Sequence, residues 1–316
     1  MTTMIRVNDL RKNYHSQSSN KFAGIGSKDN IEEGLSFSVS KGEVFGVIGP
    51  DGAGKSTLFR ILTTLLLPDY GTASMNGYDV VKDYKYIRQN IGYMPGKFSL
   101  YEDLSVEENL KFFATVFDIS IEENYSLIKD IYDPIKPFKK RRAGALSGGM
   151  KQKLALSCAL IHKPKVLILD EPTTGLDPVS RKELWDMLKK LKNEGITVLV
   201  STAYMDEANL CDRIALMGEG EFIAIDTPAN VIANYKEILW SVSGDKMALM
   251  LKDLRMYPEV KTIFAFGDTH HITVSENLKK EELKNHLIEK GYMQLKIQKI
   301  TPTVEDCFLA LTHKRQ

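Results

Sequence analysis

GPDGAGKST, residues 49–57, decides the fold of this chain. The stretch matches the spacing G-x-x-x-x-G-K-[ST], in which glycines let backbone N–H groups converge on phosphate oxygens at a helix N-terminus. We expect Lys55 to reach the β- and γ-phosphates of a nucleotide and Ser56 to bind Mg²⁺. A chance match in about 300 residues has odds of order one in a hundred, so an ordinary strand-to-helix turn is a weak alternative. The residues predicted to bind phosphate are Gly49, Asp51, Gly52, Ala53, Gly54, Lys55, Ser56 and Thr57.

The residues on both sides of this loop predict strands and a helix. IRVNDLRKNY at 5–14 predicts a strand, and the Ser- and Gly-rich stretch 15–34 predicts a surface loop. LSFSVSKGEVFGVIGP at 35–50 predicts two strands separated by a Lys-Gly turn. KSTLFRILTTLLL at 55–67 predicts a helix that Pro68 ends. The apolar face of that helix would carry Leu58, Ile61, Leu62 and Leu65.

VLILDEP, residues 166–172, ends a strand in two acids. Its four apolar residues predict a buried strand, whose end would present Asp170 toward Mg²⁺ and Glu171 toward a water that attacks the γ-phosphorus. Alone, Asp-Glu after a strand would be unremarkable. In a chain that also has a phosphate-binding loop, Asp170 and Glu171 are predicted to be the metal-binding and the catalytic carboxylate, respectively.

LSGGM, residues 146–150, precedes a predicted helix that would point away from the chain's own nucleotide. We therefore expect it to act in trans, on a nucleotide bound by a second domain. A Ser-Gly-Gly turn that caps a helix is the alternative, and it would be preferred for a lone match. Here KQKLALSCALIHKP and the acid-ended strand follow, which favours the functional interpretation. The residues concerned are Leu146, Ser147, Gly148, Gly149 and Met150.

The rest of the chain predicts an α/β domain and a smaller α+β appendage. From about residue 99 the hydrophobic spacing becomes helical, and residues 103–105 offer N-caps for VEENLKFFATVFDI. Helices and strands then alternate, which predicts a mostly parallel sheet. After about residue 230 the predicted order is β-α-β-β-α-β, in an appendage whose function its residues do not reveal. We expect His270 and His271 there to be surface or turn residues, because neighbouring side chains of a strand point to opposite faces.

Composition excludes several classes of protein. The 316 residues are 43% hydrophobic and 26% charged, which is typical of globular domains with one large and one smaller core. The 42 basic and 41 acidic residues leave a net charge of +1, which predicts no nucleic-acid partner. The three cysteines, Cys158, Cys211 and Cys307, lack metal-ligand spacing and are expected to be reduced packing residues. No apolar stretch approaches the roughly 18–20 residues of a membrane span, so we expect a cytosolic chain.

With these motifs in this order, the chain resembles the ATP-binding subunits of ATP-binding cassette (ABC) transporters over residues 5 to about 230. In this resemblance GPDGAGKST is the Walker A motif, LSGGM the signature and VLILDEP the Walker B motif. TTGLDP at 173–178 is the D-loop, which carries Asp177. Tyr14 lies where family members stack an aromatic ring on adenine.

The resemblance implies an α/β fold: a P-loop NTPase with a RecA-like core, an antiparallel β subdomain and a helical subdomain at about 97–160. This ABC ATP-binding domain would span 1–230 and the α+β accessory domain 231–316. The resemblance also implies ATP and Mg²⁺ as cofactors and a nucleotide-dependent dimer with a second copy or another cassette. Integral membrane permease subunits would contact the insert at about 99–140 and hold the chain at the inner face of the cell membrane.

Two positions depart from the family pattern. Gly96 stands where the family usually has the Q-loop glutamine, and Ala203 stands where it has a histidine. Those side chains normally contact the metal, the water or the γ-phosphate, which glycine and alanine cannot do. We expect turnover to be slowed by about 10- to 1000-fold, with ATP binding largely intact.

Three functional hypotheses follow. The stretches 137–181 and 201–205 (STAYM) are similar to the ATPases of ABC-2-type exporters linked to multidrug or cation efflux. The leading hypothesis is therefore an ATPase that powers a separate export permease. An ATP-binding regulatory or structural subunit with little hydrolysis is the second, and it rests on Gly96 and Ala203. A soluble ABC protein acting on ribosomes or DNA would carry two cassettes or a long coiled coil, and the sequence predicts neither.

Overall fold

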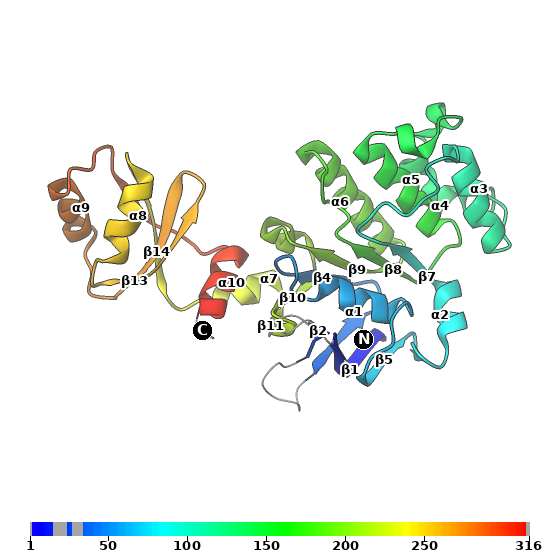
Figure 1. Ribbon diagram of the computed structural model, residues 1–316, viewed down its shortest axis with the longest axis horizontal. Helices are drawn as coiled ribbons and strands as arrows, with labels where there is room; N and C mark the ends of the chain where they lie inside the picture. The colour runs from blue at the N-terminus through cyan, green and yellow to red at the C-terminus, as the bar shows by residue number, and fades with distance from the viewer. Residues whose placement is uncertain (1, 15–23, 27–33, 314–316) are drawn as a thin grey trace. The chain divides into compact units, whose positions relative to one another are not determined.

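The computed structural model describes residues 2–14, 24–26 and 34–313. The chain forms two compact units, Met1–Pro228 and Ala229–Gln316 (Figure 1). Most of the loop expected at 15–34 lies outside the described residues. Within it, Gly24–Ile25 forms a short strand, β2, so the expectation of a surface loop is wrong there. The side chain of Ile25 is fully buried, because β2 pairs with the first strand and adds this residue to the core.

A six-stranded sheet forms the centre of the first unit, in the order β11-β10-β4-β9-β8-β7. All neighbouring pairs are parallel except β10 and β11, which confirms the predicted alternation of strands and helices. Strands β4, β8 and β9 are buried along their whole length, as the apolar runs of a parallel sheet require. Their carboxyl ends lie at one edge of the sheet, where ligands bind in open α/β folds. The strands are β4 (Val44–Ile48), β7 (Ile91–Met94), β8 (Val166–Asp170), β9 (Thr197–Thr202), β10 (Arg213–Gly218) and β11 (Glu221–Asp226).

A separate antiparallel sheet comes from the first part of the chain. Strand β1 pairs with β2, β3 and β5, and β5 pairs with β6. The two strands predicted around the Lys-Gly turn do not form a hairpin, because β3 joins β1 whereas β4 enters the parallel sheet. Apolar residues of both sheets share one core with helix α1. The strands are β1 (Thr3–Asn13), β3 (Leu35–Ser40), β5 (Tyr70–Met75) and β6 (Tyr78–Asp79).

Helix α1 (Lys55–Leu62) follows the phosphate-binding loop and is shorter than predicted. Thr64 adopts a φ of 64°, and the N–H of Leu65 returns to the carbonyl of Arg60 at 2.8 Å. The helix therefore ends before Pro68 is reached. Leu65, predicted on the buried face, is 59% exposed, whereas the other three predicted apolar residues are fully buried.

The helical insert contains α3 (Val106–Val116), α4 (Tyr125–Tyr132) and α5 (Gly148–Leu160). The predicted cap of α3 is confirmed, since the Glu108 N–H donates to Ser105 Oγ and the Ser105 N–H donates to Glu108 Oε2. Within the described ranges, no helix is long and apolar enough to cross a bilayer. The other helical elements of this unit are α2 (Tyr84–Asn90), α6 (Pro178–Asn193) and 3-10 turns at Lys136–Phe138, Ala143–Ala145 and Met205–Leu210.

The second unit contains the predicted β-α-β-β-α-β order in a four-stranded antiparallel sheet, β13-β14-β12-β15. Helices α7 (Pro228–Ala233) and α10 (Val304–His313) flank this order in the chain, and neither was predicted from the sequence. The remaining elements are β12 (Ile238–Ser243), α8 (Met247–Arg255), β13 (Val260–Phe266), β14 (Thr269–Val274), α9 (Lys280–Glu289) and β15 (Lys296–Lys299).

The two adjacent histidines lie inside β14, so the expectation of surface or turn residues is wrong. His270 is 4% exposed and its Nε2 lies 2.8 Å from the Met247 carbonyl oxygen. His271 Nδ1 lies 2.7 Å from Asp306 Oδ1. These partners begin other elements of the unit, which a local sequence pattern cannot show. The three cysteines are buried and unpaired, as predicted for packing residues.

Candidate nucleotide-binding site

The predicted phosphate-binding loop connects β4 to α1 through backbone that favours glycine. Gly52 and Gly54 have φ of 80° and 104°, in the left-handed region that residues with a Cβ rarely adopt. A Cβ on Gly49 would lie 2.1 Å from the Met217 carbonyl oxygen, so β10 packs directly against the start of the loop. The loop thus ends at a helix N-terminus, where unpaired N–H groups and the helix dipole favour an anion.

Lys55, the first residue of α1, is buried within this loop at 3% exposure. Its ammonium group donates to the carbonyl oxygens of Gly49 and Pro50, at 2.8 and 3.0 Å. It also lies 3.1 Å from Glu171 Oε1, the carboxylate predicted to be catalytic. The fold therefore brings the loop lysine and the acid from the end of β8 into one site. A phosphate held by the loop would compete with Glu171 for this ammonium group.

Asp170 and Glu171 follow β8 but lie in different environments. Asp170 is 4% exposed and accepts a hydrogen bond from the hydroxyl of Ser201 at 2.6 Å. Burial, and then the charge of Asp170, raises the pKa of Tyr93 on the neighbouring strand to about 12. Glu171 has a φ of 51°, a left-handed conformation that costs a residue with a Cβ about 1–3 kcal/mol. Its N–H compensates by donating to the Ser201 hydroxyl and carbonyl oxygens, at 2.9 and 3.1 Å.

The two predicted oxygen ligands of a magnesium ion, Ser56 and Asp170, lie on elements that contact each other. Ser56 is the second residue of α1, Asp170 ends β8, and α1 contacts β8. Magnesium usually binds proteins through one or two carboxylates, with substrate phosphates and waters completing its octahedron. One hydroxyl and one carboxylate beside a phosphate-binding loop fit that donor set.

The signature residues begin α5. Ser147 is its N-cap, and its hydroxyl accepts from the Met150 N–H at 3.4 Å, so the capping alternative is also satisfied. A Cβ on Gly149 would lie 2.9 Å from Ser180 Oγ, which places the signature against the start of α6. Among the described residues, no polar contact joins 146–150 to the phosphate-binding loop. The role of residues 146–150 toward a nucleotide bound by a second domain stays a prediction.

Asp177, the predicted D-loop residue, is the N-cap of α6. Its carboxylate accepts from the N–H groups of Val179 and Ser180, both at 3.0 Å, and from the Ser180 hydroxyl at 2.6 Å. The hydroxyl bond from Ser180 is the main cause that lowers the pKa of Asp177. Since Ser180 also faces Gly149, the D-loop and the signature are neighbours within one chain.

The remaining predicted positions lie around the same edge. The Tyr14 hydroxyl is 3.4 Å from Thr57 Oγ1 of the phosphate-binding loop, and the residue is 42% exposed. A Cβ on Gly96 would lie 3.1 Å from the Asp170 carbonyl oxygen, which places the predicted Q-loop position next to the acid-ended strand. Ala203 directly follows β9, whose last residue accepts from the Gly49 N–H through its carbonyl oxygen at 3.2 Å.

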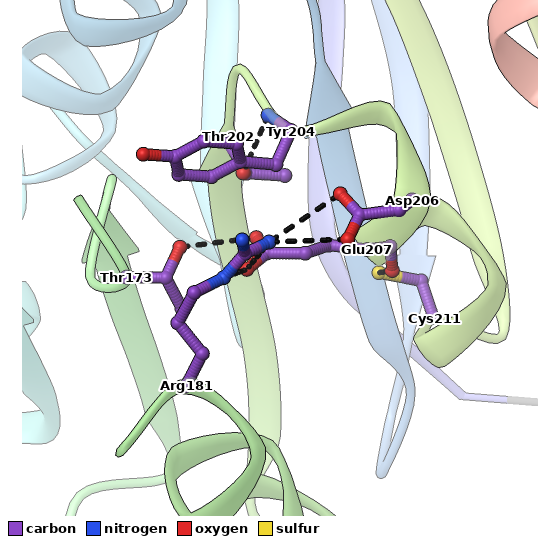
Figure 2. A network of polar contacts seen from close by, with 7 residues as sticks. All are labelled: Thr173, Arg181, Thr202, Tyr204, Asp206, Glu207 and Cys211. Carbon is purple, nitrogen blue, oxygen red and sulfur yellow. Dashed lines mark hydrogen bonds and ion pairs between the residues drawn. The ribbon is translucent and has the colours of Figure 1, made fainter. Parts of the chain in front are cut away.

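Sequence reasoning missed a polar cluster behind this edge, shown in Figure 2. Arg181 in α6 lies 3.0 Å from Glu207 and 3.3 Å from Asp206. The hydroxyl of Thr173, three residues after Asp170, donates to Glu207 Oε2 at 3.1 Å. Arg181 on a predicted helix, and Glu207 in a segment with no predicted element, carry no local signal for such a pairing. Only the repeated acids of YMDEA, close after the family histidine position, could have drawn attention to it.

This arrangement of strand, glycine-rich loop, helix and acid-ended strand defines a P-loop nucleotide-binding protein. Residues 33–174 match the family model described as ABC transporter. The Nod factor export ATP-binding protein I of Burkholderia lata is 38% identical over 288 residues, covering 89% of this chain and 92% of that protein. With cbiO1 from Clostridium perfringens, part of the ABC transporter complex cbiONQ, the TM-score is 0.62 at 28% identity, over 74% of this chain and 92% of that one.

The chain therefore belongs to the ABC transporter ATP-binding proteins. A further relative, the probable multidrug ABC transporter ATP-binding protein YbhF of Escherichia coli K12, is 38% identical over 283 residues. This match covers 88% of the present chain but 48% of YbhF, so the chain spans about half the length of that relative.

Proposed function

We propose that this chain binds Mg-ATP at the Walker A loop and hydrolyses it to drive a separate ABC-2-type export permease. The 3.1 Å contact between Lys55 Nζ and Glu171 Oε1 carries the proposal. It puts the phosphate-binding cation and a carboxylate able to orient water in one site. A bound triphosphate would replace Glu171 as the partner of Lys55, and the released carboxylate could then orient a water toward the γ-phosphorus.

Each site residue has a role in this proposal. The loop N–H groups and Lys55 bind the phosphate oxygens. Ser56 and Asp170 would hold Mg²⁺, which neutralises charge on the β- and γ-oxygens when bound. Tyr14, exposed beside the loop, would stack on adenine. The signature of a second cassette, either another copy or a different one, would cover the γ-phosphate in a nucleotide-dependent dimer.

A cavity of about 480 Å³ supports the proposed permease contact. It lies between the end of β7, helix α3 and helix α5, next to the segment that follows Gly96. Its walls are mainly apolar, and Leu65 on its rim is 59% exposed. An apolar cavity of this size can take a short helix presented by a membrane subunit. The apolar lining includes Leu65, Met94, Leu100, Phe113, Phe117 and Ala159.

Two relatives support export as the direction. One is named for Nod factor export and the other as a probable multidrug transporter subunit. We extend export to this chain on that similarity, and we place the chain at the inner face of the cell membrane through its permease. The transported substrate would be set by residues of the permease.

Steady-state phosphate release with Mg-ATP tests the proposed hydrolysis. Glu171→Gln keeps the shape of the side chain but removes the carboxylate, and we expect phosphate release to fall to background. Glu276→Gln makes the same change at an exposed residue of the second unit and should leave the rate unchanged. Equal rates in the wild-type protein and Glu171→Gln would contradict hydrolysis at this site.

The same experiment tests the second candidate, an ATP-binding subunit with little hydrolysis. Gly96 favours it, because a glycine beside Asp170 supplies no side chain to the metal or the water. Tight binding of a fluorescent ATP analogue together with equal background rates in both proteins would select this candidate.

Membrane fractionation of native cells tests the permease contact. Leu65→Glu places a charge at the rim of the cavity and should release the chain from the membrane fraction. Leu67→Glu is the matched control, since Leu67 is 64% exposed but does not line the cavity. Release of both variants, or of neither, would contradict docking at this cavity.

A further inference from the structure

The cluster in Figure 2 joins three segments that border the nucleotide site. Thr173 lies in the loop after Glu171, and Arg181 lies in the first turns of α6, after the D-loop. Glu207 lies in the segment after β9, close to Ala203. Side chains from all three segments meet at the Glu207 carboxylate, which is 2% exposed.

The Glu207 carboxylate accepts hydrogen bonds on both of its oxygens. Arg181 donates through Nε and Nη2, at 3.1 and 3.0 Å, in a two-pronged pairing. Thr173 donates its hydroxyl to the other carboxylate oxygen at 3.1 Å. The guanidinium also lies 4.1 Å from the ring centroid of Tyr204, which fixes its plane. A buried charge is favourable only when its hydrogen-bond partners are in place, so this network holds the segments of Thr173, Arg181 and Glu207 in fixed positions relative to one another.

One of these segments carries backbone strain at the proposed catalytic residue. Glu171 adopts its φ of 51° only if the surrounding structure enforces it. Ser201 holds its N–H on one side. On the other side, the Thr174 N–H returns to the Glu171 carbonyl oxygen at 3.2 Å, and Thr173 anchors this turn to Glu207.

The D-loop is attached to the same anchor. The Arg181 N–H donates to the Asp177 carbonyl oxygen at 3.0 Å, and the Leu176 N–H donates to that of Thr173 at 3.1 Å. A change at Glu207 would therefore reach both Glu171 and Asp177 through short, hydrogen-bonded turns.

We infer that Thr173, Arg181 and Glu207 are positioning residues, which hold the Glu171 turn and the D-loop against the segment that carries Ala203. They act on Glu171 and Asp177 through the hydrogen-bonded turns that link the cluster to these two residues. Through the Glu207 carboxylate, the segment that carries Ala203 is tied to both Thr173 and Arg181. The expected effect on the rate of phosphate release rests on the proposed hydrolysis. The expected effect on the positions of the three segments does not depend on it.

Thr173→Val tests the inference with little change in side-chain shape. It removes only the hydroxyl that binds Glu207, while Thr173→Ser restores a hydroxyl. We expect Thr173→Val to lower kcat for phosphate release at least about tenfold, because small misplacements of a catalytic group cost up to about 100-fold. The affinity for a fluorescent ATP analogue should change less than about twofold, since the phosphate-binding loop is untouched. Thr173→Ser should recover most of the rate.

Thr115→Val is the matched control. Thr115 is exposed in α3, and its hydroxyl bonds only the Lys111 carbonyl oxygen in the same helix. This variant should keep the wild-type kcat. A wild-type kcat in Thr173→Val would overturn the inference, as would a loss of ATP affinity as large as the loss in rate.

Hydrogen exchange separates this inference from the proposed function. Backbone amides in 173–177 and 203–208 should exchange faster in Thr173→Val than in the wild-type chain or Thr173→Ser. If the wild-type chain releases no phosphate, the proposed hydrolysis fails, and the exchange rates still decide whether the cluster holds these segments. Unchanged exchange in both segments would overturn the positioning role.

Discussion

Arg181→Met would remove the cation that lies 3.0 Å from the buried Glu207 carboxylate. Removing one partner of a buried ion pair costs about 3–5 kcal/mol, because the other charge stays buried without compensation. Glu207 is 2% exposed, but the Arg181 side chain is 23% exposed, so part of the pair is already screened by solvent. We therefore expect a loss of about 3 kcal/mol in the free energy of unfolding, at the lower end of that range.

The reverse change, Glu207→Gln, should cost less. Arg181 keeps Asp206 as a partner at 3.3 Å and keeps its access to solvent. The expected loss is about 1.5–2 kcal/mol, at the lower end of the range for hydrogen bonds to charged groups. In the double variant the uncompensated carboxylate is gone, so its loss should not exceed that of Arg181→Met alone.

Calorimetry of the full chain and urea unfolding measure these differences. A loss of about 3 kcal/mol corresponds to a fall in Tm of roughly 6–12 °C for a unit of 150–250 residues. The transition to follow is that of the first unit, Met1–Pro228, because two units need not unfold together. A loss of less than about 1 kcal/mol in Arg181→Met, or single losses that add in the double variant, would show that the pair is not a coupled buried ion pair.

Two further predictions concern the loop and the thiols. In Gly54→Ala, the new Cβ would lie 2.8 Å from Ile25 Cγ2, on backbone with a φ of 104°. The affinity for a fluorescent ATP analogue should therefore fall at least about tenfold. The control is Gly77→Ala, which has a φ of 83° and open space around the new Cβ, and it should leave this affinity unchanged. Burial raises the pKa of all three cysteine thiols above the ordinary 9.0, to about 11 for Cys307. A thiol reagent at pH 8 should therefore label the native chain slowly, whereas in the unfolded chain it should label all three cysteines. Above pH 9 the unfolded chain then binds fewer protons than the folded chain, so the free energy of unfolding should fall as pH rises, and a flat profile between pH 9 and 11 would contradict this.

Local patterns predicted the elements that depend on neighbouring residues. The N-cap of α3 at Ser105, the glycine-rich loop and the acid-ended strand each rest on residues a few positions apart, and each is present as predicted. The length of α1 was not predictable in this way, because a left-handed Thr64 ends the helix while the leucine run continues. The burial of Ile25 was hidden by the Ser- and Gly-rich composition of the whole stretch 15–34.

The sequence by itself determined the phosphate chemistry and the family, because a phosphate-binding loop works through the spacing of residues within one strand–loop–helix unit. Only the tertiary structure decided which acid meets Lys55, and which arginine neutralises Glu207. These contacts join segments far apart in the chain, and burial in a low-dielectric interior makes them strong. Neither distance nor burial between such segments is encoded in a local pattern, so the cluster behind Glu171 appears only when the chain is folded.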